Sequence, residues 1–129
     1  MKEVVEEKME NNKKEQLEAL KVLADFQNKM ISNAEILIEE LTTVKKEDTN
    51  DLLKSVTDSL NWEIGVLNGT LSLINEESEK LSKEDINSAV TILADALRTQ
   101  DDKNIAEALE QELLPMLKKV RDVVAEFNN

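Results

Sequence analysis

Two glycines and one proline are all that the 129 residues contain of the two residue types that most often interrupt regular secondary structure. A sheet of several strands needs such residues at its turns, whereas helices joined by short polar loops do not. Apolar residues also recur at spacings of three and four, which is the period of an α-helix and not of a strand. The chain is therefore predicted to be all-α.

Four amphipathic segments carry this periodicity, and polar loops separate them. The first helix is expected to end between Thr42 and Lys46, and Asp48, Thr49 or Asn50 can cap the second. Ser82, three residues before Asp85, resembles the capping box of a third, shorter helix. The four apolar stripes run from Leu17 to Val44, from Leu53 to Ile74, from Ile86 to Leu97 and from Ile105 to Phe127.

Pro115 interrupts the fourth stripe, because proline lacks the backbone donor and clashes with the preceding helical turn. The fourth helix is therefore expected to kink near Gln111 or to split into two at Pro115. The apolar residues predicted to form its stripe are Ile105, Ala108, Leu109, Met116, Val120, Val123, Val124 and Phe127.

Short connections between helices of this length favour antiparallel neighbours. Together the segments predict an uneven up-down-up-down four-helix bundle that forms a single domain over residues 1–129. The run from Glu6 to Glu15 is strongly polar. Whether residues 1–14 are frayed or disordered is therefore left open.

The residue types needed for common catalytic and metal centres are missing. The chain has no Cys and no His, which excludes the usual zinc sites and the Glu-x-x-His ligands of di-iron bundles. Neither a glycine-rich phosphate loop nor a GxSxG nucleophile motif is present. We expect no enzyme, no catalytic residue, no cofactor and no metal.

A formal net charge of −12 is spread along the whole chain and leaves no basic face. Binding to nucleic acid or to anionic lipid depends on clustered Lys and Arg, so neither partner is expected. No apolar run reaches the length of a membrane span, and no signal-peptide pattern is present at the start. A cytoplasmic location is expected by elimination.

The second helix is apolar on two sides. Between Ser55 and Asn75 there is no Lys or Arg, and Asp58 and Glu63 are the only charged residues. A four-helix bundle covers one broad side of each helix, so the second apolar side needs another cover. Three candidates could cover it: a neighbouring part of the same chain, a second copy of the chain, or a protein partner. The residues predicted to form this protein interface are Trp62, Gly65, Val66, Gly69 and Leu73.

The last part of the chain carries a motif of the form IA-x-x-LE-x-ELLP-x-L, formed by Ile105-Ala106, Leu109-Glu110, Glu112-Leu113-Leu114-Pro115 and Leu117. With Asn61-Trp62 upstream, this motif resembles a family of small bacterial all-helical proteins that has no assigned activity. The resemblance covers about the last 80 residues. Gln111 departs from it, since an aromatic residue is expected there. The resemblance implies an uncharacterised helical domain and no mechanism.

The expected function is that of a non-enzymatic protein-binding helical module of the small chaperone or adaptor type. Small acidic helical proteins with an uncovered apolar side commonly hold partner helices. The alternative is a structural homo-oligomer, such as a homodimer, in which the second apolar side of the second helix is used for self-association. Either way, the expected partner is a protein or a second copy of the chain.

Overall fold

The computed structural model describes the backbone of residues 2–128 and the side chains of residues 13–128, and all regular structure in these residues is helical. The prediction of an all-α fold is confirmed. The helical backbone begins at Lys2. The question left open for residues 1–14, whether they are frayed or disordered, falls largely on residues 1–12, whose side chains lie outside the described part. The elements are α1 (Lys2–Thr42), α2 (Thr49–Ile74), α3 (Lys83–Arg98), α4 (Asp102–Ala108), the π-helical turn η1 (Leu109–Leu113) and α5 (Leu114–Glu126).

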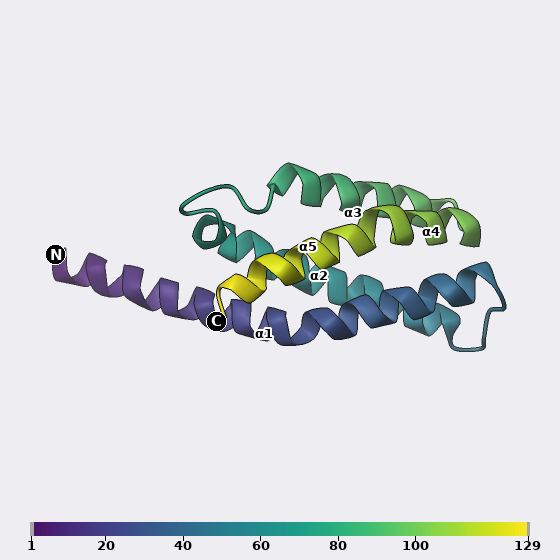
Figure 1. The fold of residues 1–129 in the computed structure, drawn as a ribbon, viewed down its shortest axis with the longest axis horizontal. Helices are drawn as coiled ribbons and strands as arrows, with labels where there is room; N and C mark the ends of the chain where they lie inside the picture. Colours follow the sequence, from purple (N-terminus) through teal and green to yellow (C-terminus); the bar gives the residue numbers. More distant parts are fainter. Residues whose placement is uncertain (1, 129) are drawn as a thin grey trace.

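Successive helices run in opposite directions, with α4, η1 and α5 joined end to end as the fourth (Figure 1). Helix α1 packs against α2 and against the α4–η1–α5 segment, whereas α3 packs against α4 and η1. The amino-terminal end of α1 extends beyond the other helices (Figure 1). The predicted uneven four-helix bundle, with a kinked last helix, is confirmed.

Hydrogen bonds from short polar side chains fix the turns between the helices. Ser82 accepts a hydrogen bond from the Asp85 backbone N–H, as the capping box predicted, and Asp101 caps α4 in the same way. Asp48 precedes α2 but makes no side-chain capping bond. Thr49 closes that corner, since its hydroxyl accepts from the Lys46 N–H at 2.8 Å and donates to Glu40 at 2.7 Å.

The buried apolar side chains form two clusters, one towards each end of the bundle. The first contains Met30, Leu37, Leu60, Leu93 and Leu109, and the second contains Leu20, Leu23, Leu67, Ile74 and Val120. Ile64 and Met116 contact both clusters. The two ends of the stripe predicted on α1, Leu17 and Val44, are exposed and belong to neither cluster.

The π-helical turn η1 changes which residues of the fourth helix face the core. The Leu114 N–H donates to the Leu109 carbonyl, five residues back, so this turn holds one residue more than an α-helical turn. Leu113 and Leu117 are fully buried, and Met116 is only half-buried. The omission of Leu113 and Leu117 from the predicted core positions was wrong, whereas Met116 packs against both clusters from a half-buried position.

Candidate functional site

Neither a metal centre nor a membrane span was found in the part of the chain that the structure describes. No group of three or more His, Cys, Asp or Glu side chains could hold a metal ion there. None of the described helices is both long enough and apolar enough to cross a bilayer. The candidate site is therefore sought among exposed apolar side chains, grooves and buried polar groups.

Two apolar side chains meet on the outer face of α1 and α2. The ring of Phe26 packs edge-on against that of Trp62, with ring centres 5.5 Å apart and an angle of 79° between the ring planes. Trp62 nevertheless remains 43% exposed, and Val22, one turn before Phe26 on α1, is 55% exposed. Together with Asp58 and Ser59 these residues line a shallow hollow of about 390 Å³.

A second hollow of about 410 Å³ continues along the same two helices. A β-carbon at Gly65 or at Gly69 would meet no heavy atom within 4 Å, so the space above both glycines is open. Gln16 crosses between the helices and donates a hydrogen bond of 2.9 Å to the Gly69 carbonyl. We call the two hollows together the α1–α2 outer groove; its further lining residues are Glu15, Ala19, Val66 and Thr70.

Four of the five residues predicted as an interface lie on this groove. Trp62, Gly65 and Gly69 are exposed and Val66 is half-buried. Leu73 is buried at 8% exposure and belongs to the second core cluster, so the prediction that it lies on the outer side was wrong. The loop after α2 explains this burial.

That loop folds back over the end of α2. The Asn75 side chain accepts from the Lys80 and Leu81 N–H groups and donates to the Leu81 carbonyl. Leu81 thereby enters the same cluster as Leu73. Val22 and Phe26 were not predicted as interface residues, although a spacing of four residues places these two apolar side chains on one side of a helix.

Directly beneath the aromatic pair lies a buried polar pair. Gln27 and Glu63, the residues that follow Phe26 and Trp62, are both 0% exposed, and the Gln27 Nε2 donates a hydrogen bond to the Glu63 Oε1. The other two oxygens, Gln27 Oε1 and Glu63 Oε2, have no hydrogen-bond partner. Burial raises the pKa of Glu63 to about 7, and the hydrogen bond from Gln27 lowers it in part.

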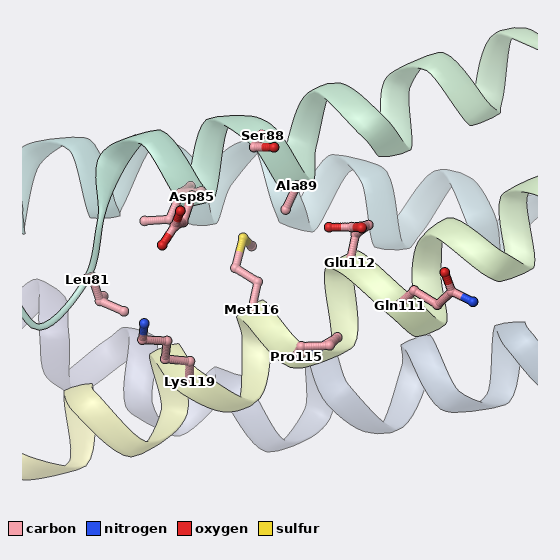
Figure 2. A pocket seen from close by; sticks show the side chains of 10 residues that line it. Leu81, Asp85, Ser88, Ala89, Gln111, Glu112, Pro115, Met116 and Lys119 are labelled. Atoms are coloured by element: carbon pink, nitrogen blue, oxygen red, sulfur yellow. The ribbon is translucent and has the colours of Figure 1, made fainter.

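A third hollow, of about 290 Å³, lies between α3 and the η1–α5 segment. Figure 2 shows Met116 pointing into it towards α3, with Asp85 and Ser88 on one side and Glu112 and Lys119 on the other. None of these four polar side chains is buried. This hollow is a shallow depression beside α3, a helix with few buried residues. It holds no buried polar group that could orient a ligand.

Comparison with known proteins gives a family and no function. No curated protein and no solved structure matches the chain. A family model described as a domain of unknown function (DUF8042) matches residues 18–123, from the part of α1 that packs on the bundle to near the end of α5. The chain belongs to this family.

Proposed function

We propose that this chain is a non-enzymatic protein-binding module, of the small chaperone or adaptor type, that holds one amphipathic helix of a partner protein in the α1–α2 outer groove. The observation that carries this proposal is the half-exposed Trp62, which lies beside the exposed Val22 and an open groove above two glycines. Exposed tryptophan next to small residues is a common arrangement where a helix docks.

The shape of the groove favours a helix as the occupant. Its two hollows follow the same pair of helices and are lined by successive turns of α2, from Asp58 to Thr70. The open space above Gly65 and Gly69 allows another backbone to approach closely, since no side chain projects from these positions. A partner helix would present apolar side chains to Val22 and Trp62 and small ones to the glycines.

The charge of the groove favours a partner with basic edges over a second copy. The two charged side chains that line the groove, Glu15 and Asp58, are both acidic. A partner helix flanked by Lys or Arg would complement them. Two copies, each with a net charge of −12, would repel each other across the same surface. The alternative function, a homo-oligomer, therefore becomes the second outcome of the test.

Trp62 supplies the measurement, because it is the only tryptophan in the chain. A designed amphipathic peptide without tryptophan, with a leucine stripe and lysine edges, is expected to bind and shift the Trp62 emission to shorter wavelength. The same peptide with glutamate edges is expected to bind more weakly. Val22→Asp should weaken binding of the lysine-edged peptide about tenfold to a hundredfold, since burying a valine is worth about 1.5 to 3 kcal/mol.

Ile92→Asp is the matched control. Ile92 is 40% exposed, comparable with Trp62, but lies on α3, away from the groove, so the substitution should leave peptide binding unchanged. Sedimentation of the peptide-free protein decides between the two functions. A dimer that Val22→Asp dissociates would support the homo-oligomer and overturn the partner proposal. A monomer whose Trp62 emission responds to neither peptide would contradict both.

We also propose the finer features that the sequence suggests. A cytoplasmic location agrees with the absence of cysteine, which gives no indication of a secreted disulfide fold. A bacterial source follows only from the resemblance of the carboxyl-terminal motif. The motif is a plausible family signature because its Leu109 to Pro115 segment spans the π-helical turn, which sets the faces of the last helix. We expect no nucleic acid and no membrane as partners.

A further inference from the structure

Two consecutive residues of α1 face two consecutive residues of α2 in the middle of the bundle. Phe26 and Trp62 pack together on the outside, and Gln27 and Glu63 meet on the inside. Along α1, Gln27 lies between Leu23 of one apolar cluster and Met30 of the other; along α2, Glu63 lies between Leu67 and Leu60 of the same clusters. The Gln27–Glu63 pair is thus a polar layer that divides an apolar core.

If Glu63 is ionised, this layer lacks the hydrogen atom that would join its two unpaired oxygens. The single hydrogen bond joins the Gln27 Nε2 to the Glu63 Oε1. The oxygens that remain, Gln27 Oε1 and Glu63 Oε2, are buried acceptors without a donor. Each such group destabilises the fold when it is shielded from water, and a charged one does so more strongly. One proton on Glu63 Oε2 would turn one of the two acceptors into a donor for the other.

We propose that the folded bundle binds a proton at Glu63 near neutral pH, with the Oε2–H donating to Gln27 Oε1, and that this proton strengthens the contact between α1 and α2. The amide and the carboxylic acid then form a closed ring of two hydrogen bonds in which every polar atom of the layer has a partner. The pair is a proton-binding site in the core.

The surroundings of the carboxyl group favour the neutral acid. Glu63 and Glu40 are the buried ionisable side chains among the described residues, and Glu40 is engaged by Thr49 at the α1–α2 corner. Burial is the dominant cause that raises the pKa of Glu63 to about 7. Charged side chains on the elements around this layer are exposed or only half-buried: Asp25 and Lys29 on α1, Asp58 on α2, Asp85 on α3, and Glu112, Lys118 and Lys119 on the fourth helix.

The proton links folding to pH in a defined direction. The pKa of Glu63 rises from 4.5 to about 7 on folding, so between these values the folded state holds a proton that the unfolded state has released. The stabilisation is complete below pH 4.5, declines as the pH rises to about 7, and declines no further above it. Within that window this group alone should raise the equilibrium constant of unfolding about tenfold per pH unit.

Carboxyl carbon NMR of the wild-type protein tests the proposal without a substitution. Glu63 is assigned as the resonance that is lost in the Glu63→Gln variant. We expect this resonance to titrate with its midpoint near 7, well above the ordinary glutamate pKa of 4.5. A resonance that has completed its titration by pH 5.5 or so would show an ionised carboxylate at neutral pH and would overturn the proposal.

Denaturant unfolding from pH 4 to 9 tests the link to stability. Glu63→Gln places an N–H where the acid has its O–H. The equilibrium constant of unfolding of the variant should therefore lack the tenfold rise per pH unit and should be several hundredfold smaller than that of the wild type at pH 8. Glu18→Gln, which removes one exposed negative charge from α1, is the matched control and should keep the wild-type slope. Equal slopes in the wild type and Glu63→Gln would contradict the link.

Gln27→Leu separates the pair from simple burial. In the neutral acid both hydrogen bonds of the ring are made, and Gln27→Leu removes both and leaves the Glu63 carboxyl group unpaired in the core. Gln27→Leu should therefore unfold more readily than the wild type at pH 4, where the ring is complete. Equal stability of the two proteins at pH 4 would show that the amide and the acid do not form the proposed ring.

Discussion

Replacing Leu93 with alanine is expected to lower the free energy of unfolding by about 2 to 5 kcal/mol. Leu93 is 2% exposed and packs in the first core cluster. The expected change in the free energy of unfolding is large because α3 has only three buried residues, and the other two are Ile86 and Ala89. Helix α3 packs on α4 and η1, so a cavity at Leu93 removes one of the few buried apolar side chains that hold α3 on the bundle.

Urea unfolding followed by circular dichroism measures this change, and the adjacent residue supplies the control. Ile92 is 40% exposed, and Ile92→Ala should alter the free energy of unfolding by no more than about 0.5 kcal/mol. Similar losses for the two substitutions would mean that α3 is rotated about its axis relative to the structure. A loss below about 1 kcal/mol for Leu93→Ala would mean that α3 does not pack stably on the bundle.

The helices and their ends were predictable because the signals that set them are local. Ser82 caps α3 through the Asp85 N–H, which a spacing of three residues is enough to suggest. The end of α1 at Thr42 and the start of α4 after Asp101 likewise follow polar residues at the edge of an apolar stripe. Local chemistry and the helical period together fix the number, the order and the antiparallel arrangement of the helices.

The candidate site was predictable only in part, because exposure depends on contacts between distant segments. The stretch of α2 without Lys or Arg correctly placed Trp62, Gly65 and Gly69 on an outer surface. Leu73 shares their helical side but is buried, since the loop that follows it brings Leu81 into the core. The helical period of α2 gives no information about the position of that loop.

The buried polar pair shows a second limit of the helical period. Gln27 lies within the range of the apolar stripe predicted on the first helix, but Glu63 was counted only as one of two charged residues between Ser55 and Asn75. Nothing in either helix alone indicates that the two side chains meet, because they are separated by 36 residues. Only the packing of α1 on α2 brings the amide to the carboxyl group and removes water from both.

The π-helical turn leads to the second prediction of a large effect. A chain that lacks Gln111, an exposed residue within η1, is expected to lose about 3 kcal/mol or more of folding free energy. Removing one residue converts the wide turn into an α-helical one and leaves Leu109, Leu113 and Leu117 at spacings of three and four. The core face would then be continuous, but Pro115 would lie in a helix interior, where it lacks a donor and clashes with the carbonyl of Glu110.

Pro115→Ala distinguishes this cause from a loss of packing. In the full-length chain Pro115 occupies the first turn of α5, where proline is tolerated, so Pro115→Ala should change the free energy of unfolding by less than about 1 kcal/mol. In the chain without Gln111 the same substitution removes the clash and should restore most of the loss. Chemical unfolding of the four proteins gives the coupling between the two changes, expected near 3 kcal/mol. Coupling near zero would show that core packing, and not the proline, requires the wide turn.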